Sequence, residues 1–140
     1  RDNPDYRMQL FGYPEWQTYT KDHLEAFFEL DTYFYSSFYT NNLLPAAINF
    51  TKNYRRWYGK EMDERYPKFG MLGFDTGYFF LKGLARYGSS FEKNMQGFDL
   101  IPIQTGFKFQ RVNNWGGFIN KKVFFVHFTK NFELVKLDFD

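Results

Sequence analysis

Two histidines, His23 and His127, are the residues best suited to acid–base or metal chemistry in a chain of 140 residues that has no cysteine. His23 lies in a predicted helix and His127 in a predicted strand, and neither has an acid or nucleophile beside it at the spacing of a catalytic motif. Acidic pairs such as Asp63 and Glu64 are typical of solvated helix faces. Without cysteine, disulfides, thiolate zinc sites and cysteine nucleophiles are excluded. The sequence therefore predicts a protein that is not an enzyme and uses no metal and no cofactor.

The glycine-rich segment FGMLGFDTG, residues 69–77, is a candidate phosphate loop. It lacks the Lys-Ser/Thr pair of a P-loop and does not match the GxGxxG pattern. We expect its glycines to allow a tight strand-to-helix turn, with Asp75 as the N-cap of the helix that follows. A second turn signal, NNWGG at residues 113–117, could bind a ligand but is explained more simply as a hairpin turn with an aromatic anchor.

Aromatic and basic residues are interleaved in the segment YRRWY, residues 54–58, a pattern that also occurs where proteins stack single-stranded nucleic acid. On a helix, Arg55 and Arg56 point away from the three aromatic side chains. We therefore interpret the aromatics as a core stripe and the arginines as a solvated face. The net charge of +2, from 18 basic and 16 acidic residues, gives no concentrated cationic field. No nucleic acid partner is predicted.

Composition places the chain among folded proteins. Aromatic residues make up 24 % of it, which is far more apolar surface than a disordered composition carries. Apolar runs in the sequence stop well short of the roughly 20 residues that a membrane helix requires. The chain starts at Arg1 without a signal peptide, so we expect a processed or excised piece of a longer protein.

Strand and helix patterns alternate through residues 7–103. They are a strand over 7–12, a helix from Thr20, a strand over 31–39 that is buried on both faces, a helix that begins near Leu43 and ends near residues 59–62, and a helix over 77–87 that ends at Gly88. Pro45 falls in the first turn of the long helix, where a missing N–H costs nothing. This order favours a layered α/β architecture with a mainly parallel sheet.

The last third of the chain has a different pattern. Residues 1–6 are predicted to be a linker, 7–103 the α/β portion, and 104–140 a β-rich tail. The tail contains strand patterns over 106–111, 115–120, 123–128 and 132–139. We expect the final two strands to form a hairpin across Thr129–Asn131.

Several strings in this order resemble one protein family. They are LFGYPEW, LDTYFYSSFYTN, FTKNYRRWYGKE, YPKFGMLGFDTGYFFLKGLARYG and the tail GFKFQRVNNWGGFINKKVFFVHFT. Together they are similar to the second half of type I periplasmic binding proteins, the leucine/isoleucine/valine-binding family of ABC transporter substrate-binding proteins. The amino-acid sequence most resembles the Bacteroidetes branch of the family, whose members often carry peptidoglycan-binding LysM modules. The resemblance covers most of the chain, and its strength is the order of the elements.

The resemblance implies a particular architecture and place in the cell. Proteins of this family have two three-layer α/β lobes joined by three crossings, and they hold a small ligand in the cleft between the lobes. The chain would then be a C-terminal part that contains pieces of both lobes, with crossings near residues 39–42 and 104–108. It would act in the periplasm or cell envelope, with a membrane transporter as a partner.

The resemblance also implies a set of ligand-binding residues. Glu15, in the turn after the first strand, would offer its carboxylate to the amino group of an amino-acid-like solute, with Tyr13 and Trp16 beside it. Tyr39 would stand at the hinge and cleft, and Asp75 falls in the family's aromatic-Asp pair, where capping is the larger part of its role. A sugar or cell-wall fragment stacked on Trp16 is an equally admissible ligand. The location agrees with the rule that open α/β sheets bind ligands outside the carboxyl ends of their strands.

Two functions follow, a solute-binding module and a cell-envelope interaction or structural domain that engages peptidoglycan or a protein partner. An exposed Glu15 and Trp16 would favour the first, and their burial in a packed contact would favour the second. If strands pair with a missing N-terminal portion, apolar edges stay open in this piece. We therefore expect the truncated fragment to self-associate.

Overall fold

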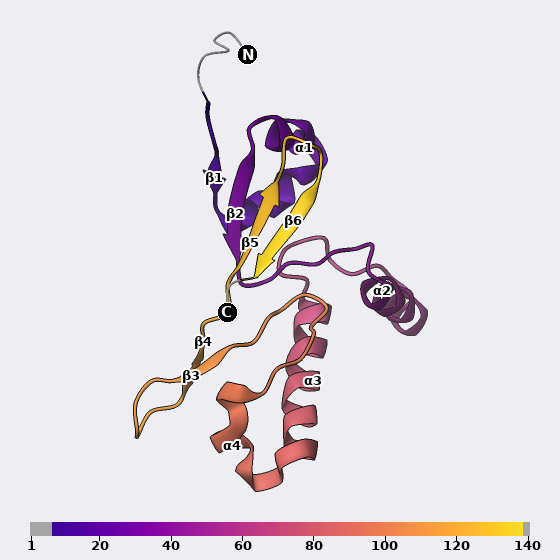
Figure 1. Cartoon of the computed structure of the whole chain (residues 1–140). Coiled ribbons are helices and arrows are strands. Elements are labelled where there is room, and N and C mark those ends of the chain that lie inside the picture. The colour runs from indigo at the N-terminus through magenta and orange to yellow at the C-terminus, as the bar shows by residue number, and fades with distance from the viewer. Residues whose placement is uncertain (1–6, 139–140) are drawn as a thin grey trace. The chain divides into compact units, whose positions relative to one another are not determined.

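A computed structural model describes residues 7–138, which form two compact units (Figure 1). Unit 1 contains the described residues up to Ser37 and those from Val123 onward, and unit 2 is Phe38–Lys122. Unit 2 is therefore an insertion between two segments of unit 1. The predicted boundary between residues 103 and 104 lies inside unit 2, and the predicted linker, residues 1–6, lies outside the described residues.

Unit 1 is built on a four-stranded sheet. Its strands are β1 (Phe11–Gly12), β2 (Thr32–Ser36), β5 (Phe124–Phe128) and β6 (Leu134–Asp138), in the order β1-β2-β5-β6. Only the β1–β2 pairing is parallel, since β2–β5 and β5–β6 are antiparallel. The chain is thus α/β with a mixed sheet, but the mainly parallel sheet predicted for it is wrong. The predicted hairpin of the last two strands is confirmed, with Phe125 opposite Leu137.

Helices cover one face of this sheet. The 3-10 helix η1 (Pro14–Tyr19) follows β1 and continues into α1 (Thr20–Glu29), which begins at the predicted residue. Phe27 of α1 is buried and packs on Phe128, with ring centroids 5.4 Å apart. On the other face, Phe11 and three further residues line an open apolar depression. Because α1 is the one α-helix in the described part of unit 1, these residues do not form the three layers that the resemblance implies.

Burial alternates along β2 and β5 because successive side chains of a strand point to opposite faces. Thr32, Phe34 and Ser36 are buried, whereas Tyr33 and Tyr35 are half-buried. The expected strand over 31–39 with two buried faces is therefore wrong: β2 ends at Ser36. The predicted strand over 7–12 is likewise reduced to the two residues of β1.

Unit 2 consists of helices and a small hairpin. Its elements are α2 (Pro45–Tyr58), α3 (Phe69–Tyr87), η2 (Gly88–Ser90), α4 (Phe91–Asn94), η3 (Met95–Gly97), β3 (Phe109–Arg111) and β4 (Phe118–Asn120). The long helix has Pro45 in its first turn, as predicted, and it ends at Tyr58, just before the predicted range of 59–62. Gly59 adopts a φ of 65°, a conformation that glycine takes without steric cost.

The helix α3 begins eight residues before the helix that the sequence predicted over 77–87, at Phe69. Gly70, Gly73 and Gly77 therefore lie inside a helix and form no turn, and Asp75 is not a cap. Phe79 of α3 is the centre of the apolar core of unit 2, where it is buried with Phe91 and Phe98. Rings from the β3–β4 region join this core, because Phe107 and Phe109 lie 4.7 and 5.3 Å from the Phe79 centroid.

Candidate functional site

Tyr13 and Glu15 lie in the turn that follows β1. Tyr13 is 65 % exposed and precedes Pro14, which starts η1, and the Glu15 side chain is exposed in the first turn of this helix. Since β1 and β2 are parallel, their carboxyl ends meet at the same edge of the sheet, and the ring of Tyr13 stands edge-on to Tyr35 of β2 at 6.4 Å. This edge is where open α/β sheets bind ligands.

Trp16 has a packing role in unit 1. Its ring is half-buried and stacks on Phe27, with centroids 5.9 Å apart and planes 6° from parallel. It also lies over Gly12 so closely that a Cβ at Gly12 would fall 2.2 Å from the indole. Of the two residues that distinguish the candidate functions, Glu15 is thus exposed, as a solute site requires, and Trp16 is packed, as the alternative requires.

Tyr39 belongs to unit 2, near its first residue. Its N–H donates to the carbonyl oxygen of Gln104 at 2.9 Å. Burial raises the pKa of the Tyr39 phenol to about 12, with a further contribution from Tyr66. The phenol is therefore neutral at physiological pH and can donate a hydrogen bond.

Asp75 is a buried helix residue that binds a neighbouring segment. Its carboxylate accepts hydrogen bonds from the backbone N–H groups of Ile103, Gln104 and Thr105, each at 2.8 Å. The side chain of Gln104 in turn accepts from the Lys68 N–H and donates to the Lys68 carbonyl, next to the start of α3. Asp75 thus fixes residues 103–105 onto α3, whereas the sequence predicted a cap.

The structure therefore divides the predicted set between the two units. Tyr13, Glu15 and Trp16 belong to unit 1, and Tyr39 and Asp75 belong to unit 2. Within unit 1, exposed Tyr13 and Glu15 are the side chains that can reach a ligand.

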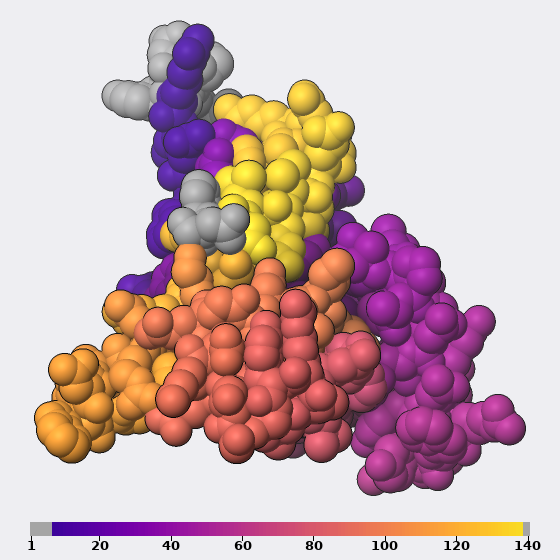
Figure 2. Space-filling model, turned by 60° about the horizontal axis from the view of Figure 1, so that its bottom comes forward, coloured from indigo at the N-terminus to yellow at the C-terminus, as the bar shows by residue number. Residues whose placement is uncertain are grey.

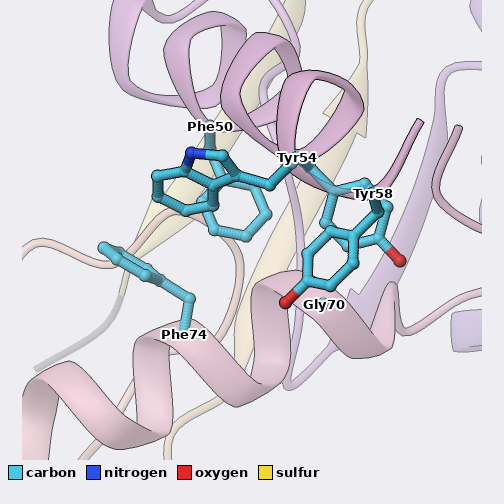
Figure 3. A pocket seen from close by; sticks show the side chains of 6 residues that line it. Phe50, Tyr54, Tyr58, Gly70 and Phe74 are labelled. Atoms are coloured by element: carbon cyan, nitrogen blue, oxygen red, sulfur yellow. The ribbon is translucent and has the colours of Figure 1, made fainter. Parts of the chain in front are cut away.

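An aromatic groove between α2 and α3 was not predicted (Figure 3). We define it by its lining residues, Phe50, Tyr54, Trp57, Tyr58, Gly70 and Phe74, which enclose about 250 Å³. Figure 3 shows Phe74 projecting from α3 toward Phe50, and Tyr58 nearer to Gly70. The rings of Phe50 and Phe74 are 5.1 Å apart, and those of Tyr54 and Tyr58 are 4.6 Å apart.

This groove corrects the interpretation of residues 54–58 as a core stripe. Trp57 is 74 % exposed and Tyr58 is 62 % exposed, and the one buried residue of α2 is Ala47. The spacing of the aromatic residues correctly predicted a shared helix face. It could not show that this face borders a groove, because that depends on how much of α3 lies against it. A flat apolar ligand or an apolar side chain is the occupant that such rings favour.

His127 and Asp31 form a pair across β5 and the start of β2. His127 Nε2 lies 2.6 Å from Asp31 Oδ1, and Gln9 Nε2 donates to Asp31 Oδ2 at 2.8 Å. These hydrogen bonds, that from Gln9 above all, lower the pKa of the Asp31 carboxyl. The imidazole also stacks on Tyr33 at 3.8 Å. The pair therefore braces neighbouring strands.

Among residues 7–138, no group of three or more metal-ligating side chains comes together. None of the helices in these residues combines the length and apolar character needed to cross a membrane.

The chain was also compared with known proteins. No protein-family model, no curated protein and no solved structure matches it.

Proposed function

We propose that this chain is a non-enzymatic solute-binding module of the cell envelope, a part of a two-lobed type I periplasmic binding protein. The observation that carries the proposal is the connectivity of the two units. One α/β unit is interrupted between β2 and β5 by a second unit, so the chain crosses at Ser37/Phe38 and returns at Lys122/Val123. Two units with repeated crossings are what the resemblance implies, but residues 104–108, where it places the second crossing, lie inside unit 2.

The open face of the unit 1 sheet supports the finer fold. Phe11 is 59 % exposed and forms an apolar depression of about 490 Å³ with Tyr33, Phe125 and Leu137. An apolar sheet face needs a covering layer. We propose that elements supplied by the remainder of the protein cover it and complete three layers. Alone, this piece self-associates through the same face, which a rise in sedimentation coefficient with concentration would report.

Glu15 is the residue that we assign to ligand recognition. Its carboxylate is exposed beside the carboxyl ends of β1 and β2, where it can accept hydrogen bonds from the amino group of an amino-acid-like solute. Tyr13, which is also exposed, supplies an aromatic wall and a phenol. This pair gives charge recognition and shape recognition without any catalytic group.

The test is a thermal-shift screen of the parent protein against amino acids, sugars and muropeptides. A ligand at a hundred times its Kd stabilises the fold by about 2.7 kcal/mol, which is detectable. We expect one class to raise the Tm of the wild type, Glu15→Gln to abolish the shift, and Glu25→Gln to preserve it. Glu25 is the matched control because it is an exposed glutamate on α1 in the same unit. A shift that survives Glu15→Gln would refute the assignment of the site.

A second candidate, an envelope interaction domain, is favoured by the aromatic groove. With Trp16 packed on Phe27, the accessible tryptophan of the α2–α3 region is Trp57, 74 % exposed. If the domain engages peptidoglycan through this groove, the parent protein sediments with purified cell walls and Trp57→Ala releases it. If no small compound raises the Tm and Trp57→Ala releases the protein from cell walls, the interaction domain replaces the solute-binding module as the proposed function.

A further inference from the structure

The hairpin β3–β4 of unit 2 presents a fully exposed tryptophan. The strands pair antiparallel, with Phe109 opposite Asn120 and Arg111 opposite Phe118. Trp115, in the connection between them, is 97 % exposed, and Val112 is 57 % exposed. In Figure 2 the orange segment that holds this connection protrudes beyond the pink and salmon atoms of α3 and α4. Exposing so large an apolar side chain leaves its hydrophobic free energy available to a partner.

The connection is held in one shape by hydrogen bonds. The N–H groups of Trp115 and Gly116 donate to the side chain and carbonyl of Asn113, at 2.9 and 3.3 Å. The Val112 N–H donates to the Gly117 carbonyl at 3.0 Å, and Arg111 Nη1 donates to the Gly116 carbonyl at 3.1 Å. Trp115 is therefore displayed on a braced turn, so little conformational entropy is lost when it is buried by a partner.

The same segment carries basic residues without acidic ones. Residues 106–122 contain four basic residues and no acidic residue. The whole chain has a net charge of +2, so the other residues together carry −2, which is +2 minus +4. Lys108 and Lys121 are exposed at the base of the hairpin, where the Lys121 N–H donates to the Lys108 carbonyl at 2.9 Å. Arg111, near the tip, makes an ion pair with Glu92, and surface pairs of this kind contribute little.

We propose that the β3–β4 hairpin is an anchor for an anionic lipid surface. Tryptophan prefers the boundary between headgroups and acyl chains, because its ring is apolar and its indole N–H can remain hydrogen-bonded. Val112 adds apolar contact, and the cations of the hairpin contact the negative headgroups, whose field attracts nearby Lys and Arg. Single-stranded nucleic acid fits less well, because it needs several rings on which successive bases stack, and the tip carries one.

The test is co-sedimentation of the 140-residue chain with vesicles of phosphatidylcholine alone and of phosphatidylcholine mixed with phosphatidylglycerol. We expect binding to the mixed vesicles, which weakens with added salt. Trp115→Ala lowers the partition coefficient at least about tenfold, whereas Ile101→Ala, which alters an equally exposed side chain of unit 2, leaves it unchanged. In the wild type, the fluorescence emission of Trp115 should shift to shorter wavelength on binding, and this shift should be absent in Trp115→Ala.

Two double variants with the same change in net charge test whether the lysines of the hairpin are required. Lys108→Glu with Lys121→Glu weakens binding by about fivefold or more for each lysine. Lys52→Glu with Arg56→Glu makes the same change in net charge on the exposed side of α2 and leaves binding in place. An equal loss in both pairs would show attraction by net charge alone and would overturn the anchor.

Three other results would also overturn it. They are equal binding to uncharged vesicles, an unaltered partition coefficient for Trp115→Ala, and binding to an anionic polysaccharide or oligonucleotide without binding to vesicles. Because Trp115 is exposed, its variant keeps the wild-type Tm, so a loss of binding is not a loss of folding.

Discussion

Units 1 and 2 have similar aromatic content but bury it in different ways. In unit 1 the alternation of β2 and β5 places every second residue in one apolar layer, where Phe34, Phe124 and Phe128 are buried. In unit 2 an apolar cluster surrounds Phe79, and the buried carboxylate of Asp75 ties a separate segment to the same helix. Both units thus contain polar side-chain contacts, such as the buried Gln17–Ser36 hydrogen bond of unit 1. Unit 2 differs in that a buried carboxylate accepts three backbone hydrogen bonds from a separate segment.

Several aromatic rings of unit 2 are accessible and not buried. On α2 the aromatic side chains border a groove, and Trp115 of the hairpin is almost fully exposed. A high aromatic content therefore does not by itself indicate burial. In unit 2 it indicates surfaces on which a partner can gain hydrophobic contact.

The largest effect that distinguishes the units is expected from Asp75→Ala. This change leaves three backbone N–H groups without their acceptor, each of which costs about 1–3 kcal/mol when buried. We expect a loss of at least about 3 kcal/mol in the free energy of unfolding of unit 2, measured by urea denaturation. Hydrogen exchange should accelerate at residues 103–105 and in α3 while β2 and β5 keep their protection.

Asp99→Ala is the control for this variant. Asp99 is an exposed aspartate of the same unit that accepts one hydrogen bond, from the N–H of Leu100. Its loss should change stability by less than about 0.5 kcal/mol. If Asp75→Ala is equally mild, or if protection falls equally in both units, the polar network does not distinguish unit 2.

Alanine substitutions at two glycines of α3 should change the free energy of unfolding by smaller amounts, and in opposite directions from each other. A Cβ at Gly83 would lie 2.1 Å from the Phe91 ring, so Gly83→Ala overpacks the core and costs about 1–3 kcal/mol. A Cβ at Gly77 meets nothing within 4 Å, so Gly77→Ala stabilises the helix by about 1 kcal/mol. Thermal unfolding of the two variants measures both signs. If Gly77→Ala instead destabilises unit 2, residue 77 lies in the turn that the sequence predicted and α3 starts later.

Patterns with a short repeat predicted the local elements well. Alternating side chains predicted β2 and the β5–β6 hairpin, and Pro45 marked the first turn of α2. The start of α3 was missed because Gly70, Gly73 and Gly77 favour a turn locally. Tertiary contacts override that preference, for Gly70 lies against Tyr54 and Asp75 bonds to residues 103–105.

The direction of the strands and the composition of the site could not be predicted from local sequence patterns. Alternating strands and helices predict a parallel sheet only if every helix returns the chain to the same sheet, and α2 and α3 belong to unit 2. Likewise, the order of elements predicted the position of Glu15 after β1. It did not predict the packing of Trp16 on Phe27, because no sequence motif indicates this contact. The groove and the exposure of Trp115 are also consequences of tertiary structure.

The smallest expected effect is a dependence of unit 1 on pH through Asp31. The hydrogen bonds from Gln9 and His127 lower the pKa of this carboxyl from 3.8, and Lys130 adds to the effect. A group whose pKa is lower in the folded state contributes stability above its unfolded pKa and loses it as the pH falls through its folded pKa. The contribution of Asp31 is therefore complete near neutral pH and disappears below pH 3.8, over the range down to its folded pKa.

Asp31→Asn tests this contribution because asparagine also tolerates the positive φ of 51° at this position. We expect the difference in urea midpoint between wild type and Asp31→Asn to be greatest at neutral pH and to shrink on acidification. Asp22→Asn, which alters an exposed aspartate of α1, should track the wild type throughout. A difference for Asp31→Asn that is constant with pH would mean that the brace between β2 and β5 depends on hydrogen bonding alone. The charge of Asp31 would then contribute nothing to unit 1.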